Sequence, residues 1–179
     1  MDQRLKVRSL SDPAFAAMGG TYANLCWPHR KPTGKSRRRG VRFYADLVGV
    51  NLGSAPDGTP NNVASISVCR VLPRNTTHDP LEFHEATGEG VFNFNASDDI
   101  VLLLAKAGTQ DPPKREDVLA FRVPYGTFVS LPKGMWHWAP VSMAPDNNWP
   151  IYVMILLPPE TYRKDCHVRK LNLGLWVRP

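Results

Sequence analysis

The chain has 179 residues, of which 42% are hydrophobic, and it contains 17 prolines and 13 glycines. This length suits one domain with a sizeable core, and the frequent turn residues favour many short strands over long helices. No run of 18 apolar residues is present and the first residues lack the apolar stretch of a secretory signal, so we expect a cytoplasmic protein without a membrane span. The three cysteines lie far apart, which fits reduced thiols.

The formal net charge of +6 is concentrated in one segment, residues 29–42. Between Arg30 and Arg42 there are seven Lys or Arg residues and no acidic residue. Such a run can serve nuclear localisation or nucleic-acid contact, but this one lacks the interleaved aromatic residues that stack on bases. We therefore expect a basic loop over residues 29–42 and no nucleic-acid partner.

Most of the chain reads as β-structure. A short helix is expected from Asp12 to Met18, because Asp caps helices well and Pro13 suits the first helical position. The run 100–105 is apolar throughout, as in a strand that is buried on both faces. Residues 158–179 carry several basic side chains and are expected to form a tail or a dimer arm. The predicted strands cover residues 64–71, 91–95, 100–105, 118–123 and 151–157.

One motif combines a strand, a tight turn and a histidine. Its spacing is Gly126-x5-Pro132-x-Gly134-x2-His137, in which Pro132 fixes φ for the turn and Gly134 can take a positive φ. This pattern resembles the second of the two motifs that mark cupin barrels. The resemblance implies that His137 reaches the central cavity, where a metal or a small substrate binds.

An upstream segment, Glu82-x-His84-x4-Glu89, is similar to the first cupin motif, with Glu82 where the usual pattern has histidine. Residues two apart share one face of a strand, so Glu82 and His84 can project inward together. The two motifs predict an all-β fold: a single cupin-type antiparallel β-barrel, jelly-roll-like, over residues 1–179, with a short N-terminal helix. They also predict that Glu82, His84, Glu89 and His137 converge on one cavity.

Beyond the two motifs, the sequence resembles the ureidoglycolate lyase (ureidoglycolate hydrolase) family from about residue 5 to about residue 157. Two differences bear on the substrate: Trp138 stands where the family tends to have a second histidine, and Glu89 where it often has glutamine. The segment 30–42 is divergent and enlarged. The segments that carry the resemblance are Leu5–Gly20, Arg42–Leu47, Ile66–Arg70, the Glu82-x-His84-x4-Glu89 motif and Trp136-His137.

The resemblance implies a homodimeric lyase that releases glyoxylate and urea from ureidoglycolate, a small anion of allantoin and purine degradation. In this reaction a base takes the hydroxyl proton, an acid protonates the departing nitrogen, and a cation holds the carboxylate. His137 or Glu89 would supply the base and His84 the acid. Arg70 would clamp the substrate carboxylate, because guanidinium binds carboxylates bidentately, while Trp138 would form a wall of the substrate site.

The same cavity residues could hold a metal. His84 and His137 with Glu89, and with Glu82 beside them, form a set of imidazoles and carboxylates that suits nickel, zinc, manganese or ferrous iron. Without a metal, these residues would act as acid and base. Two other classes of protein stay open: a metal-dependent cupin oxygenase or isomerase acting on another small molecule, and a cupin that binds a ligand without catalysis.

Overall fold

The computed structural model describes residues 4–24, 53–54, 57, 64–71, 77–95, 98–143 and 151–177. The predicted basic loop, residues 29–42, lies outside the described residues.

The described residues are mostly β-strand, as predicted. Their three helical segments are short: α1 (Pro13–Ala17), the 3-10 turn η1 (Arg115–Asp117) and α2 (Thr161–Lys164). None of the described helices is long and apolar enough to cross a membrane. The strands are β1 (Arg4–Leu5), β2 (Val7–Ser9), β3 (Thr21–Asn24), β4 (Ser65–Val71), β5 (Thr77–Phe83), β6 (Glu89–Asn93), β7 (Ile100–Leu104), β8 (Leu119–Val123), β9 (Thr127–Leu131), β10 (Val141–Ser142), β11 (Ile151–Leu157) and β12 (His167–Val177).

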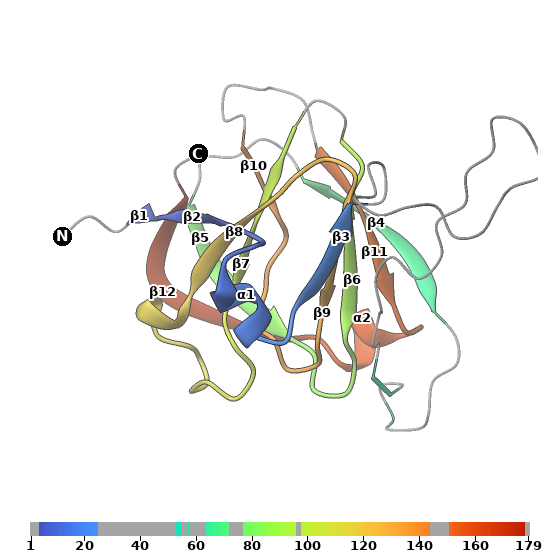
Figure 1. The fold of residues 1–179 in the computed structure, drawn as a ribbon. Helices are drawn as coiled ribbons and strands as arrows, with labels where there is room; N and C mark the ends of the chain where they lie inside the picture. The colour runs from blue at the N-terminus through green and yellow to red at the C-terminus, as the bar shows by residue number, and fades with distance from the viewer. Residues whose placement is uncertain are drawn as a thin grey trace, which may run out of the picture.

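These strands form three sheets, in the orders β3-β9-β6-β11-β4, β10-β7-β8-β2 and β1-β12-β5. Figure 1 shows the five-stranded sheet on one side of the molecule and the other strands facing it. All pairings between the longer strands are antiparallel, and only the short N-terminal strands β1 and β2 pair in parallel, with β12 and β8. The predicted all-β, antiparallel fold is thus confirmed, and it also has two short parallel pairings at the edges of its sheets.

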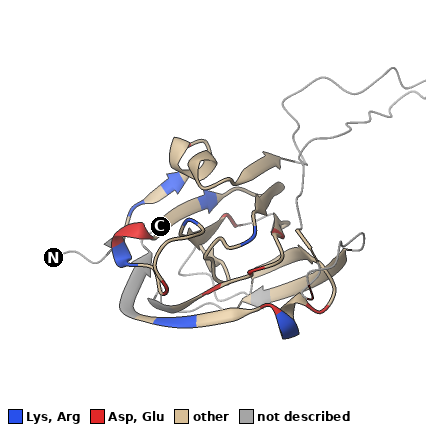
Figure 2. Cartoon of the chain, turned by 90° about the horizontal axis from the view of Figure 1, so that it is seen from below, with Lys and Arg blue, Asp and Glu red and all other residues tan. Residues whose placement is uncertain are grey.

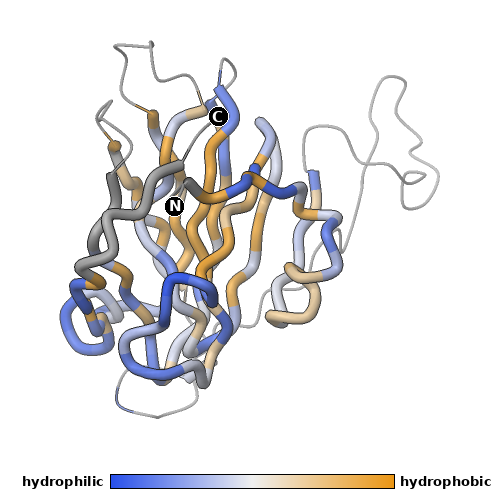
Figure 3. Tube along the Cα trace, turned by 90° about the vertical axis from the view of Figure 1, so that its left-hand side faces the viewer, coloured by the Kyte–Doolittle hydropathy of each residue, from blue (hydrophilic) through white to orange (hydrophobic). Residues whose placement is uncertain are grey.

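Strand β7 is buried on both faces, as its apolar run predicts. Ile100, Leu102 and Leu104 pack into the core cluster shared with the five-stranded sheet. Val101 and Leu103 pack on the opposite side, in a second cluster that includes Leu81 of β5 and Leu171 of β12. Figure 3 shows the apolar residues following the strands through the middle of the molecule, with hydrophilic residues in the loops at one end.

The prediction of the first helix is confirmed, whereas the predicted strand 91–95 is only partly correct. Asp12 caps α1 through its side chain, which accepts a hydrogen bond from the Ala14 N–H at 2.9 Å. The alternating segment 91–95, however, leaves the strand after Asn93. Asn93 is fully buried and donates to the carbonyls of Asp98 and Val123, so this amide links β6 to β8 inside the fold.

Residues 158–179 differ from the expected tail or dimer arm. They contain α2 and then β12, which pairs with β5 and β1 of the same chain. The physical reason is the apolar side chain of Leu171, which is buried in the second core cluster and holds the strand onto the fold. Charged residues of the described part are spread over several elements in the view of Figure 2.

Candidate functional site

The four converging residues predicted from the two motifs line one cavity of about 310 Å³. This size is at the lower end of the range for small-molecule sites. The cavity has an ionisable end, where Glu82, His84, Glu89 and His137 lie, and a wall that is mostly apolar. Among the described lining residues there is no lysine or arginine. The apolar part of the wall comes from Val68, Val91, Leu102, Leu131, Trp138, Ala139, Pro140, Ile155 and Leu157.

The two motifs are joined to each other through the main chain. Glu82 and His137 exchange two backbone hydrogen bonds of 2.8 Å, and the Gly134 N–H donates to the His84 carbonyl at 2.6 Å. Gly134 completes the predicted turn with a φ of 76°, a conformation that favours glycine. The turn and the strand pairing therefore bring the ends of both motifs together at one point of the cavity.

Both imidazole rings are held in one tautomer by backbone carbonyls. The Nδ1 atom of His84 lies 2.6 Å from the carbonyl oxygen of Asp165, and that of His137 lies 2.9 Å from the carbonyl oxygen of Met135. A carbonyl can only accept a hydrogen bond, so each Nδ1 carries the proton and donates it. Each Nε2 atom is left to face the cavity.

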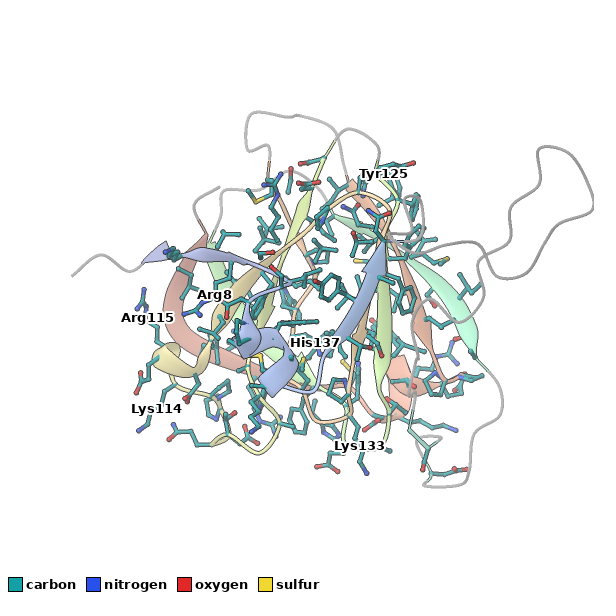
Figure 4. All side chains as sticks on the ribbon, viewed as in Figure 1. Arg8, Lys114, Arg115, Tyr125, Lys133 and His137 are labelled. Carbon is teal, nitrogen blue, oxygen red and sulfur yellow. The ribbon has the colours of Figure 1, made fainter. Side chains whose placement is uncertain are left out.

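The two Nε2 atoms converge on one carboxylate. Glu89 Oε2 lies 3.3 Å from Nε2 of His84 and 3.1 Å from Nε2 of His137, and Glu82 Oε1 lies 3.7 Å from the latter. The two rings are tilted against each other with centroids 5.0 Å apart. The contact of His137 with Glu89 is an ion-pair contact without hydrogen-bond alignment, so the buried His137 Nε2 has no hydrogen-bond partner. Figure 4 places His137 inside the fold and Lys133, of the same turn, at its edge.

The electrostatics of this cluster favour a positively charged His137 and a negatively charged Glu89. Burial opposes a charged His137, but the Glu89 and Glu82 carboxylates and the Met135 carbonyl together outweigh burial and raise the pKa of His137 to about 9. Burial also opposes a charged Glu89, but His137 and His84 together outweigh burial and lower the pKa of Glu89 to about 2. With nothing else in the cavity, an imidazolium and a carboxylate therefore stabilise each other at neutral pH.

The same arrangement fits a divalent metal ion. One possible ligand atom from each of Glu82, His84 and His137 lies within 4.8 Å of the others, and Glu89 Oε2 lies between the two imidazoles. Ligand atoms that each lie about 2.1 Å from one ion are roughly 3 Å from each other. The distances from Glu89 Oε2 to the two Nε2 atoms, 3.3 and 3.1 Å, are close to this value. The unpartnered Nε2 of His137, with its lone pair facing the cavity in the neutral form, is the observation that supports this fit.

Two residues at the site were missed by the sequence interpretation, and both lie between α2 and β12. The Asp165 carbonyl holds His84, as described above, and the Cys166 thiol donates to Glu82 Oε2 at 2.8 Å. Burial and the neighbouring Glu82 raise the pKa of Cys166 to about 12, so the thiol stays protonated at neutral pH. No motif marks these residues, because they lie about eighty positions from the histidine and carboxylate that they contact.

Two further residues, Trp138 and Arg70, were predicted to belong to the site. Trp138 lines the cavity, next to His137. Arg70 is in β4, where its backbone pairs with Tyr152, but its side chain lies outside the described part of the structure. In the same strand, Ser67 and Cys69 line the cavity.

Comparison with known proteins gives structural likeness only. No family model and no curated protein matches the sequence. Among solved structures, the chain is similar to oxalate decarboxylase from Bacillus subtilis at pH 4.6, with a TM-score of 0.40, 14% identity, and coverage of 61% of this chain and 24% of that one. A second structure, from work on the Mn(II) centres of Bacillus subtilis oxalate decarboxylase, has a TM-score of 0.40, 13% identity, and coverage of 80% and 30%.

The chain thus spans less than a third of the length of these two structures.

Proposed function

We propose that the chain is a lyase that cleaves the carbon–nitrogen bond of a small hydroxy acid, with ureidoglycolate as the substrate and glyoxylate and urea as the products. The observation that carries this proposal is the convergence of two imidazoles and two carboxylates in one cavity. The choice of substrate comes from the resemblance of the two motifs and of the segments around them to the ureidoglycolate lyase family. Homodimer formation, a cytoplasmic location and a place in purine degradation belong to the same proposal.

His137 is better suited to donate a proton than to accept one, which differs from the role of base that the resemblance implies. Its raised pKa keeps it protonated at neutral pH in the metal-free cavity. Glu89, with a lowered pKa, is a weak base. Glu82 is the more accessible of the two carboxylates, with 22% of its side chain exposed against 9% for Glu89.

In the proposed elimination, one proton leaves the substrate hydroxyl and another reaches the departing nitrogen. Glu82 accepts the hydroxyl proton of the substrate as the carbon–oxygen double bond forms. The carbon–nitrogen bond breaks, and its electron pair stays on nitrogen. His137 gives that nitrogen its proton, so urea leaves as a neutral molecule. Positioned acid–base groups of this kind contribute about 10²- to 10⁴-fold to a rate.

The substrate carboxylate needs a cation, and the described cavity lining offers none besides the imidazoles. Arg70 is our candidate for this role, because Val68, two positions before it in β4, also lines the cavity. Trp138 and the neighbouring apolar residues exclude water from the reacting groups, which strengthens electrostatic interactions there.

A bound divalent ion would be held by His84, His137 and Glu82, with Glu89 as a further ligand, and nickel, zinc, manganese and iron all accept this donor set. Such an ion supplies Lewis acidity that polarises a substrate oxygen. An imidazole cannot carry a proton on Nε2 and ligate through it, so the proton-donating role of His137 belongs to the metal-free state.

The apolar wall favours a second candidate function. Most of the lining is aliphatic or aromatic, whereas ureidoglycolate is polar throughout. A cupin oxygenase or isomerase acting on a more apolar small molecule would use that wall to bind its substrate and the ionisable end to react with it. A ligand-binding protein without catalysis would use the wall in the same way.

One assay separates these functions. The protein is stripped of metal by chelation and reloaded in separate samples with nickel, zinc, manganese or ferrous iron, and each sample receives ureidoglycolate. We expect glyoxylate and urea to appear in equal amounts in the metal-free sample, a reloaded sample or both. If every sample is inactive, the lyase proposal is wrong, and the apolar wall then favours the second candidate.

A further inference from the structure

Asp165 has a buried carboxylate that belongs to neither motif. The residue lies between α2 and β12, and only 3% of its surface is exposed. The carboxylate accepts hydrogen bonds from the N–H groups of Glu85 at 2.8 Å, Ala86 at 3.1 Å and Thr87 at 3.1 Å. It also accepts a hydrogen bond from the Thr87 hydroxyl at 2.9 Å. One side chain therefore satisfies the donors of three consecutive residues.

The main-chain carbonyl of the same residue accepts the Nδ1–H of His84 at 2.6 Å. The segment 85–87, which the carboxylate holds, joins His84 to Glu89 at the start of β6. Asp165 thus contacts the histidine directly and also fixes the short connection to the carboxylate that His84 faces.

The segment 85–87 is also held from its other side. The Ser54 N–H donates to the Ala86 carbonyl at 3.1 Å. Gly53, with a φ of 68°, approaches so closely that a Cβ atom there would lie 2.3 Å from the Ala86 carbonyl oxygen. The connection between His84 and Glu89 therefore lies between two sets of contacts, one made by the Asp165 carboxylate and one by Gly53 and Ser54.

We propose that Asp165 is the positioning residue of the cavity: its carbonyl holds the His84 ring with Nε2 toward Glu89, and its carboxylate fixes the 85–87 connection that sets the distance between them. This inference rests on the proposed function only for its consequence in catalysis, because the positioning itself requires neither substrate nor metal. Asp165 does not touch the reacting groups and acts through His84.

The test is Asp165→Asn, with Asp98→Asn as the matched control. Asp98 is also buried, at 7% exposure, and accepts a hydrogen bond from the Ser142 hydroxyl, but it does not line the cavity. The amide offers one acceptor oxygen in place of two, so donors of the 85–87 segment lose their partner. Ring-nitrogen NMR spectra of the metal-free proteins report the His84 tautomer, and amide exchange reports the connection.

In Asp165→Asn we expect the His84 signals to move from one tautomer toward a mixture. Amide exchange at residues 85–87 should become about tenfold faster or more, as for a segment that opens locally. Titration with cobalt(II) alone should show about 10- to 100-fold weaker binding, the scale for residues that orient a metal ligand. The His137 signals should stay unchanged, and Asp98→Asn should change none of these three readouts.

Unchanged His84 signals and unchanged exchange at residues 85–87 in folded Asp165→Asn would overturn the proposal. If that variant does not fold, Thr87→Val decides, because it removes one donor to the carboxylate while keeping the shape of the side chain. Its exchange at residues 85–87 should be about two- to fivefold faster, in line with one hydrogen bond, and unaltered exchange would again overturn the proposal. A wild type that binds no cobalt(II) would contradict the metal site and not the positioning role.

Discussion

The two histidines of the cavity are alike in burial, and each donates its Nδ1–H to a backbone carbonyl, but they are held in place by different means. His137 is fixed by its own neighbourhood: the carbonyl of Met135, two residues away, and the turn that ends at Gly134. His84 is fixed by Asp165, which is 81 positions away in the chain. One imidazole is thus positioned by a local motif, and the other depends on the correct docking of β12. The comparison predicts that changes near the turn and changes far from it affect the site differently.

The largest effect is expected for His137→Ala. Loss of the imidazole that donates the proton should lower kcat for ureidoglycolate cleavage by about 10²- to 10⁴-fold. Lys133→Ala, an exposed change in the same turn, is the control and should leave kcat within about twofold of wild type. The measurement is glyoxylate release under saturating substrate, and a wild-type rate in His137→Ala would contradict the assignment of His137 as the acid.

Glu89→Gln should affect both histidines, because both Nε2 atoms face this carboxylate. The raised pKa of His137 stabilises the folded protein fully below about pH 6.5, and this contribution is lost as the pH rises through about 9. The lowered pKa of Glu89 stabilises it above about pH 4.5, and that contribution is lost as the pH falls through about 2. Both contributions come from the same ion pair, which is lost at high pH when His137 is deprotonated and at low pH when Glu89 is protonated.

Urea unfolding of the metal-free proteins between pH 4 and pH 10 measures this effect. Between about pH 4.5 and 6.5, Glu89→Gln should lower the free energy of unfolding by about 3 kcal/mol, the scale for breaking a buried ion pair. The difference from wild type should shrink above pH 9. Glu116→Gln, at an exposed position of η1, is the control and should follow the wild type throughout. A pH-independent difference would show that the pair is not ionised.

Gly134→Ala tests the local positioning of His137. A residue with a side chain is strained at a φ of 76°, and the new Cβ atom would lie 3.1 Å from Cβ of Ala107. We expect the free energy of unfolding to fall by about 1–2 kcal/mol, as measured by urea unfolding. Gly108→Ala, also at a positive φ but with nothing within 4 Å of its Cβ, is the control for conformational strain without the contact. If Gly134→Ala were as stable as wild type, the turn would not be the constraint described here.

The smallest effect is expected for Arg70→Ala. If this guanidinium holds the substrate carboxylate equally well before and during the reaction, its loss should raise KM about tenfold and leave kcat nearly unchanged. Steady-state kinetics of glyoxylate release separate the two parameters. An unchanged KM would remove Arg70 from the substrate site.

The sequence was most informative where structure is determined by near neighbours. Alternation and continuous apolar runs identified β4, β7, β8 and β11 closely, since side chains on a strand share a face at every second position. The turn from Pro132 to Gly134 placed His137, and the spacing from Glu82 to His84 placed both on one face. The convergence of the four cavity residues followed from the two motifs taken together.

Long-range contacts account for what the sequence did not predict. Asn93 and Asp165 are buried polar residues, and nothing in their local pattern distinguishes them from surface residues of the same type. Asp165 and Cys166 precede a segment with many basic side chains, which favoured the interpretation of a tail. Their partners become neighbours only when β12 pairs with β5, so no short window of sequence contains both sides of these contacts.

The most direct test of the central claim, that side chains of both motifs act on one another in one cavity, is the pH at which His137 loses its proton. Ring-nitrogen NMR of the metal-free wild type, followed from pH 5 to pH 10, should show His137 protonated through neutral pH and titrating near pH 9. In Glu89→Gln, the transition should move toward the ordinary histidine value of about 6.5. A wild-type His137 that titrates near pH 6.5 and does not respond to Glu89→Gln would contradict the account.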